Sequence, residues 1–232
     1  EQAKDSTDDY RGYPKTNAQD FSESVRKYHQ AGYQLAIHGN GDAAIDMILT
    51  AYEKAQEAHF RSDSRPVIIH AQMMTAEQLD RVKKLGMTPS YFAAHTYYWG
   101  DRHKALFLGP ERANRISPTK TTQEKEIVFT LHMDTPVVPM NPMLLLWTAV
   151  NRETYSGDVL GPSERISVAQ ALRATTIDAA WQIFQEDNRG SIEVGKFADL
   201  VVLSDNPLSK DKDLRSIKVE KTLVGGVLVY PN

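Results

Sequence analysis

The sequence of 232 residues contains no cysteine. This absence excludes disulfides, thiolate nucleophiles and zinc sites built from thiolates, but it does not decide the compartment. The sequence also lacks any apolar run near the roughly 20 residues that a membrane-spanning helix needs. An excess of basic charge is missing too, because 27 Lys and Arg stand against 30 Asp and Glu, for a net charge of −3. We therefore expect no membrane span and no nucleic-acid partner.

What is present is the composition of an ordinary folded domain. Apolar residues make up 41% of the chain and charged residues 25%, which excludes a disordered tail and a fibrous repeat. At about 150 residues per domain, the length allows one or two domains. The chain starts EQAKDSTDDY, with no Met and no apolar leader, so we expect a processed product or a truncated chain. The compartment stays open, with the cytoplasm favoured over export.

Four short apolar runs predict β-strands, at 34–38, 67–71, 87–92 and 127–134. Amphipathic segments at 43–59 and 75–86 separate the first three runs, and another at 21–32 precedes them. This alternation predicts βαβ units with parallel strands. The runs are apolar throughout rather than alternating, as in strands that are covered on both faces.

Capping signals mark where two of these helices begin. Asp42 is expected to be the N-cap of the helix that follows it. The inner face of that helix is expected to hold Ala44, Ile48 and Ala51. Thr75 and Gln78 have the spacing of a capping box at the start of the next helix, which Gly86 ends.

The remaining segments complete two predicted domains, at 1–188 and 189–232. In the first, 1–20 is interpreted as a polar lead-in and 93–118 as a long aromatic loop. Helices are predicted at 121–126, at 142–151 and, as a pair, within 167–186. The second is rich in β-formers, and Gly225-Gly226 is expected to be a hairpin turn. Its roughly 45 residues are too few to bury a core, so we expect it to need strands from elsewhere.

Polar side chains end three of the predicted strands. His38 ends the first, His70 the second and Asp134 the fourth. The carboxyl ends of parallel strands form the active-site face of α/β folds, so these side chains are expected to converge. Two imidazoles and a carboxylate suit Zn²⁺ or a similar divalent ion. Each residue taken alone is also compatible with a hydrogen-bonded role in the core or at the rim, and a packing role is favoured for His132.

Longer segments resemble a known family. GSIEVGKFADLVVLSDNPL followed by KTLVGGVLVY resembles the C-terminal signature of the amidohydrolase superfamily. HGNGDAAID, VIIHAQ and MDTPVVPMNP are similar to the segments around barrel strands five, six and eight. The nearest branch is the amidohydrolase 3 group, similar to N-substituted formamide deformylases and to proteins labelled exoenzyme regulatory proteins. The implied fold is α/β: the C-terminal half of a metal-dependent hydrolase (β/α)8 TIM barrel, followed by the C-terminal strands of a small β-sandwich.

The resemblance also implies a chemistry. His38 and His70 would be metal ligands, and Asp134 would be both a ligand and the catalytic residue that takes a proton from water and returns it to the leaving nitrogen. The cofactor would be one or two divalent metal ions, Zn²⁺ above all. The metal would lower the pKa of water and polarise the carbonyl of a small amide-type substrate. The implied reaction is hydrolysis of a carbon–nitrogen bond other than a peptide bond, as in amides or formamides.

The sequence departs from this family in two ways. A complete member carries an H-x-H pair on strand one, and none occurs among the seven histidines here. Four strand–helix units are counted where a barrel needs eight, and Lys4 is not assigned as the bridging ligand. We therefore expect a fragment that binds metal weakly or not at all and shows no turnover alone. Because a half-barrel exposes strand edges, we expect it to self-associate as a dimer.

Further candidate residues follow the third strand, which would be strand seven of the barrel. In the segment 91–103, His95, Trp99, Asp101 and His103 are expected to line a substrate pocket, although packing of the rings under the rim is the alternative. Arg152 is compatible with an anionic substrate group, but a structural ion pair is favoured.

Two other interpretations stay open. One is a non-catalytic regulatory or binding protein that retains the amidohydrolase fold. The other is a different parallel α/β domain whose strand-end histidines are accidental.

Overall fold

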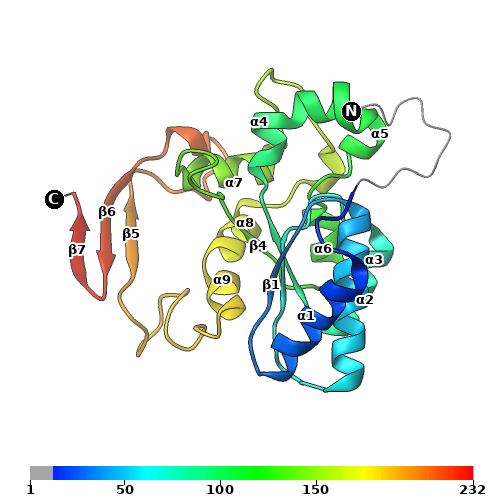
Figure 1. Cartoon of the computed structure of the whole chain (residues 1–232). Helices are drawn as coiled ribbons and strands as arrows, with labels where there is room; N and C mark the ends of the chain where they lie inside the picture. Colours follow the sequence, from blue (N-terminus) through cyan, green and yellow to red (C-terminus); the bar gives the residue numbers. More distant parts are fainter. Residues whose placement is uncertain (1–12, 232) are drawn as a thin grey trace.

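The computed structural model of the chain describes residues 13–231, which form two sheets joined by helices (Figure 1). One sheet has four strands in the order β1-β2-β3-β4, and the other has three in the order β5-β6-β7. The expected Lys4 and most of the expected lead-in lie outside the described residues. The α/β class expected from the sequence is confirmed. No helix within 13–231 combines the length and the apolar character that crossing a membrane requires.

The four-stranded sheet is parallel, as predicted. Its strands are β1 (Ala36–Gly39), β2 (Val67–His70), β3 (Thr88–Tyr91) and β4 (Thr130–Leu131). Ala36 pairs with Val67, and Val67 with Thr88, so the strands are in step across the sheet. The last strand is much shorter than the predicted run 127–134, because the backbone turns into a left-handed conformation at Asp134, where φ is 56°.

Helices α1 (Ala18–Gln30), α2 (Asp42–Ala58) and α3 (Ala76–Leu85) pack beside this sheet. Asp42 is the first residue of α2 and not its N-cap, which is Gly41. The Asp42 carboxylate instead accepts the N–H of Ala43 at 2.9 Å. Of the expected inner face, Ile48 and Ala51 are buried, but Ala44 is exposed and the neighbouring Ile45 is buried instead.

The close approach of α2 to β1 explains one glycine. A Cβ atom on Gly39 would lie 2.7 Å from Cδ1 of Ile48, which is closer than such atoms approach. A side chain at Gly39 would therefore require Ile48 to move, so glycine suits this close packing.

The predicted aromatic loop at 93–118 is wrong, because most of it is helical. It contains α4 (Ala94–Arg102), a π-helical turn (His103–Phe107) and α5 (Gly109–Ala113). The side chain of Ala93, at the N-cap position, makes no capping hydrogen bond. The rings of α4 also pack against one another rather than along one stripe, so the segment carries neither a start signal nor an amphipathic period.

The other predicted helices are present. They are α6 (Thr119–Glu124), α7 (Pro142–Asn151), α8 (Val168–Thr175) and α9 (Ile177–Gln182). The prediction of a helix at 142–151 is confirmed at both ends, and the pair within 167–186 is confirmed as α8 and α9.

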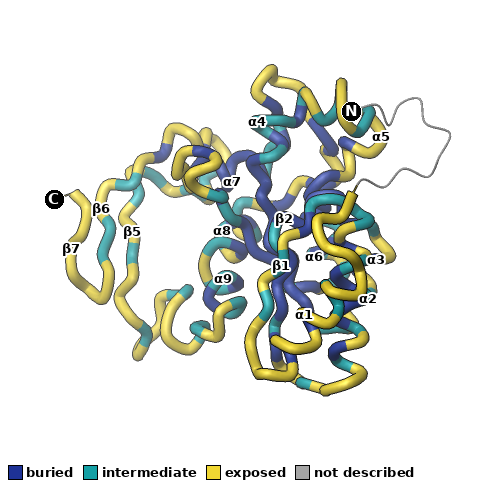
Figure 2. Tube along the Cα trace, in the orientation of Figure 1, coloured by how far each residue is buried: buried dark blue, intermediate teal, exposed yellow. Residues whose placement is uncertain are grey.

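Strands β5 (Leu200–Leu203), β6 (Val219–Val224) and β7 (Val227–Tyr230) form the second sheet. Gly225 and Gly226, with φ of 56° and 82°, form the predicted hairpin turn. Every residue of these strands is exposed or half-buried (Figure 2). The segment between β5 and β6 attaches to the helices, since Ile217 is buried and the guanidinium of Arg215 lies 4.0 Å from the Trp147 ring centroid.

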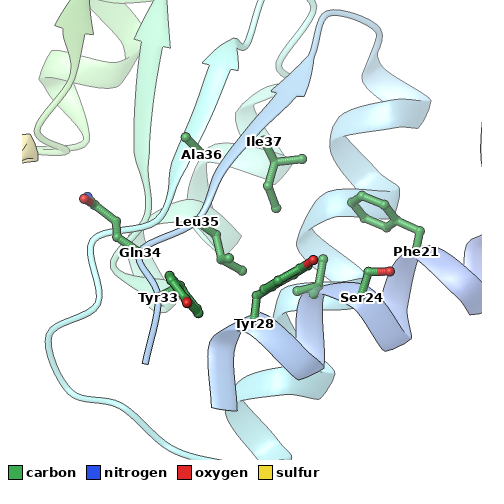
Figure 3. Close-up of a pocket in the computed structure, with 9 residues that line it drawn as sticks. Phe21, Ser24, Tyr28, Tyr33, Gln34, Leu35, Ala36 and Ile37 are labelled. Atoms are coloured by element: carbon green, nitrogen blue, oxygen red, sulfur yellow. The ribbon is translucent and has the colours of Figure 1, made fainter. Parts of the chain in front are cut away.

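Strand β1 is an edge of the parallel sheet, with β2 on one side and no strand of 13–231 on the other. A groove of about 520 Å³ runs between this edge and α1 (Figure 3). Phe21, Tyr28, Tyr33 and Leu35 contribute apolar surface to it.

Candidate metal centre

The candidate centre lies at the carboxyl end of the parallel sheet. His38 is in β1, His70 is the last residue of β2, and Asp134 follows β4 by three positions. The rings of His38 and His70 lie 4.7 Å apart between centroids and meet edge to face. Nε2 of His70 is 3.9 Å from Oδ2 of Asp134. The structure therefore brings these three side chains to one place.

His70 and Asp134 both have left-handed backbones, with φ of 71° and 56°. Non-glycine residues rarely adopt this conformation, which costs on the order of 1–3 kcal/mol and is found disproportionately at functional sites. The turn at each position places the side chain at the sheet edge. Because His70 is 5% exposed and the Asp134 side chain 37% exposed, the site has a buried floor and an open acidic side.

His132, for which the sequence favoured a packing role, is part of this cluster. Its Nε2 lies 3.1 Å from Nδ1 of His70, and its Nδ1 lies 2.9 Å from Oγ of Ser90. The sequence offered one signal for this: His132 precedes Asp134 by two residues, which places both on the same side of an extended chain.

Within the described part of the chain, His70, His132 and Asp134 each offer a ligand atom, and these atoms lie within 4.8 Å of one another. His38 is outside this group of three but contacts it through the His70 ring. Two imidazole nitrogens and a carboxylate oxygen form the donor set of a zinc-type ion, and His38, His70 and Asp134 supply the same types of donor at this place. The residues present fit a divalent metal.

Burial favours the neutral form of His70 and His132. It lowers the pKa of His70, and the neighbouring His38 lowers it further, while Asp134 acts in the opposite direction. Burial and the charge of His70 lower the pKa of His132 to about 4. Metal ligation requires the unprotonated ring, so the electrostatics of the cluster favour it near neutral pH.

The residues that were expected to line a substrate pocket lie on α4 and the turn after it. The ring of His95 is 5.6 Å from that of His70, and the Trp99 ring is 5.8 Å from that of His95. Burial lowers the pKa of His95 to about 3, and the nearby histidines add to the effect. Nδ1 of His95 is buried without a hydrogen-bond partner in the structure. His95 therefore has an unused polar atom close to the metal ligands.

His103 and Asp101 lie further along the same segment. Nε2 of His103 is hydrogen-bonded to the Gln72 amide at 3.0 Å, and its Nδ1 is buried without a partner in the structure. The carboxylate of Asp101 accepts hydrogen bonds from Thr154 and Ser156. Although burial raises the pKa of Asp101, these hydrogen bonds hold it below its usual value. Asp101 is therefore held by hydrogen bonds to the loop that follows α7.

Arg152 is buried, with 2% exposure. Its guanidinium donates hydrogen bonds to the carbonyl oxygens of Ile116, Ser117 and Leu160. These contacts occupy the side chain within the protein, so its role is structural, but the ion pair favoured from the sequence is wrong because its hydrogen-bond partners are backbone carbonyls.

Comparisons with known proteins agree with this geometry. Residues 3–230 match the family described as the amidohydrolase family. The chain is 32% identical over 220 residues to an N-substituted formamide deformylase of Arthrobacter pascens, covering 94% of this chain and 40% of that protein. It is 37% identical over 204 residues to the protein LONG AFTER FAR-RED 3 of Arabidopsis thaliana, covering 87% and 35%.

Solved structures show the same likeness. A metal-dependent hydrolase from Pyrococcus furiosus, described as uncharacterized, superposes with a TM-score of 0.70 at 27% identity, over 85% of this chain and 39% of that one. The chain thus spans about 40% of the length of the relatives that it matches.

Proposed function

The chain belongs to the amidohydrolase family, and on that premise we propose that the protein is a metal-dependent hydrolase of carbon–nitrogen bonds other than peptide bonds. The substrates proposed are small amides, formamides or cyclic amides. The observation that carries the proposal is the convergence of His38, His70 and Asp134 at the carboxyl end of a parallel sheet. Ligand sites of α/β folds occur at this end.

The proposed metal is a divalent ion, above all Zn²⁺, with His38, His70 and Asp134 as its ligands. When bound, such an ion lowers the pKa of water and polarises a carbonyl group. Asp134 is the proposed proton carrier. Its side chain is partly exposed, so it is accessible both to a water molecule, whose proton it takes, and to the leaving nitrogen, to which it returns that proton.

The proposed substrate pocket lies over α4. His95 and Trp99 are close to the metal ligands, and the unpartnered Nδ1 of His95 can bond a polar substrate atom. Trp99 offers apolar contact area. His103 is one ring further out. Asp101, whose carboxylate is engaged by Thr154 and Ser156, is placed to shape the pocket by holding the loop after α7.

The chain of 232 residues is proposed to bind metal weakly or not at all and to show no turnover by itself, because the H-x-H pair that a complete family member carries does not occur among its seven histidines. Calorimetric titration with Zn²⁺ tests this. We expect a dissociation constant weaker than micromolar, and no heat of binding in His70→Ala. Submicromolar affinity in the unsubstituted chain would contradict the proposal.

The activity is tested on the complete gene product, by metal analysis together with a screen of amides, formamides and cyclic amides. We expect hydrolysis that a chelator removes and a divalent metal restores, and a decrease of at least about 100-fold in Asp134→Asn. Lys120→Gln, at a side chain that is 39% exposed, is the control. Hydrolysis that survives both chelation and Asp134→Asn would overturn the proposal. Metal binding without turnover would favour a non-catalytic regulatory protein of the same fold.

We also propose that the chain self-associates through the β1 edge. The strand has no neighbour within 13–231 on its outer side, and the groove next to it is lined by aromatic and aliphatic side chains (Figure 3). Unpaired strand edges bordered by apolar surface favour association with another chain. A second copy of this chain is the proposed partner.

A further inference from the structure

Between the metal candidates and the base of the sheet lies a row of hydrogen-bonded polar side chains. Oγ1 of Thr130 lies 2.8 Å from Oγ of Ser90, and Ser90 lies 2.9 Å from Nδ1 of His132. Nε2 of His132 then lies 3.1 Å from Nδ1 of His70. The His132 ring is fixed in plane by stacking on Phe92, with an interplanar angle of 21°.

Both ring nitrogens of His132 are therefore engaged within the protein. A metal ion cannot replace the direct contact between His132 and His70 without breaking this row. His70 differs, because its Nδ1 faces His132 while its Nε2 faces Asp134 at 3.9 Å, too far for a hydrogen bond. Nε2 of His70 is thus the nitrogen available for a ligand.

The positions of the protons follow from this arrangement. A neutral imidazole that binds a metal through Nε2 carries its proton on Nδ1 and donates it to a neighbour. Here the neighbour is Nε2 of His132, which must then be unprotonated and act as the acceptor. His132 consequently carries its own proton on Nδ1 and donates it to Ser90. Oγ of Ser90 has two lone pairs with which to accept this proton. The single hydroxyl proton of Thr130 is donated to Oε1 of Gln182 at 2.7 Å, an amide oxygen that can only accept.

We propose that His132 is a positioning residue that holds His70 in the tautomer with a protonated Nδ1, so that Nε2 of His70 points out of the core as a ready metal ligand. The inference rests on the proposed function, because the direction in which protons are donated along the row follows from a metal bound at Nε2 of His70. His132 itself is not a ligand, although its position next to Asp134 suggests one.

The tautomer is tested on the metal-free chain at alkaline pH by long-range ¹H–¹⁵N correlation spectra of the histidine rings, with His70 assigned by its loss in His70→Asn. We expect a protonated Nδ1 and an unprotonated Nε2 on His70. His132→Phe keeps the ring but removes the acceptor, and should shift His70 toward the Nε2-protonated form. His132→Gln, whose amide oxygen can accept the same proton, should restore the original signature.

Folding of each variant is checked by circular dichroism, and His59→Gln, at an exposed position, is the matched control. Should His132→Phe fail to fold, His132→Ala carries the same expectation. An Nε2-protonated His70 in the unsubstituted chain would overturn the inference, as would a tautomer that is unchanged in both variants without the acceptor.

Titration with Co²⁺ gives a second readout. The affinity should fall by about 10- to 100-fold in His132→Phe and by less than about threefold in His132→Gln. Equal affinities in these two variants would overturn the positioning role. If the unsubstituted chain binds no Co²⁺, which agrees with weak or absent metal binding by this chain, the tautomer measurement alone decides whether His132 orients His70.

Discussion

Arg152 shows what one buried charge does for this fold. Burial lowers its pKa to about 10, so it remains charged at neutral pH. Its guanidinium bonds three carbonyl oxygens that belong to two separate loops. The planar guanidinium of arginine can donate to these three carbonyl oxygens at once, whereas the compact ammonium group of lysine cannot.

Arg152→Lys should therefore leave carbonyl groups unpaired in the interior. We expect a loss of about 3 kcal/mol in the free energy of unfolding, measured by urea denaturation. Arg165→Lys, at an exposed arginine, is the control and should change little. A loss below about 0.5 kcal/mol in Arg152→Lys would show that the side chain is not a structural anchor.

His29 provides a pH-dependent contribution to stability away from the candidate centre. It is fully buried, and Nε2 lies 2.8 Å from the carbonyl oxygen of His59. Burial lowers its pKa; the hydrogen bond opposes this, and the positive charge of Arg61 adds to it. Below the usual pKa of 6.5, the unfolded chain therefore binds a proton that the folded chain does not bind.

The stability from His29 is thus present above about pH 6.5 and lost as the pH falls. We expect His29→Gln to lose less stability than the unsubstituted chain between about pH 7.5 and about pH 5, in paired urea denaturation curves. His59→Gln, which keeps the backbone carbonyl, should behave as the unsubstituted chain. Parallel pH profiles for all three proteins would contradict the assignment.

At this scale the sequence indicated where the chemistry lies but not how each side chain is used. His38, His70 and Asp134 could be located because a parallel sheet brings its strand ends together. The hydrogen bond between His132 and His70 could not be predicted, because it depends on the left-handed turn at His70. The contacts of Asp101 with the loop after α7 also depend on distant packing.

Among the elements, α3 begins with a complete capping box. The Thr75 side chain accepts the Gln78 N–H, and the Gln78 side chain accepts the Thr75 N–H in return. Thr75→Ala should lower the free energy of unfolding by about 1 kcal/mol. Thr75→Ser, which keeps the hydroxyl, is the matched control. Equal thermal and urea midpoints for these two variants would show that the cap contributes nothing.

Elements with local signals were predicted, and elements made by tertiary contacts were not. Helices α3 and α7 have clear start signals, and both were located from the sequence. Helix α4 begins at Ala94, its N-cap residue Ala93 provides no side-chain cap, and the helix is stabilised by ring contacts such as the one between Tyr97 and Trp147. Trp147 lies on α7, which is distant in sequence, so no local sequence pattern predicted helix α4.

At the scale of the whole molecule, the β1 edge predicts association. Light scattering at high protein concentration should give the mass of a dimer. Ala36 is exposed on this edge, and a lysine there would place an unpaired charge in the interface. Ala36→Lys should therefore shift the mass toward the monomer. Gln30→Lys, which adds the same charge at the end of α1, is the control; a monomeric unsubstituted chain would refute the proposal.

The parallel order of the four strands and the hairpin of the second sheet were predictable from the repeated strand–helix pattern and from Gly225-Gly226. How the second sheet is attached was not, because it depends on Ile217 and on Arg215 stacking over Trp147. Arg215 and Ile217 lie in the segment between β5 and β6, which has balanced charge and no clear hydrophobic period.

The row of side chains that ends at His70 has a further consequence through Gln182. Oε1 of Gln182 accepts from Thr130, while its backbone carbonyl accepts from Gln34, next to the amino end of β1. One continuous line of polar atoms therefore crosses the sheet from its amino end to the imidazoles. A substitution that disturbs α9 would therefore also disturb the imidazoles through these hydrogen bonds. Variants of this helix should lose thermal stability and metal affinity together, even though none of its residues is a proposed metal ligand.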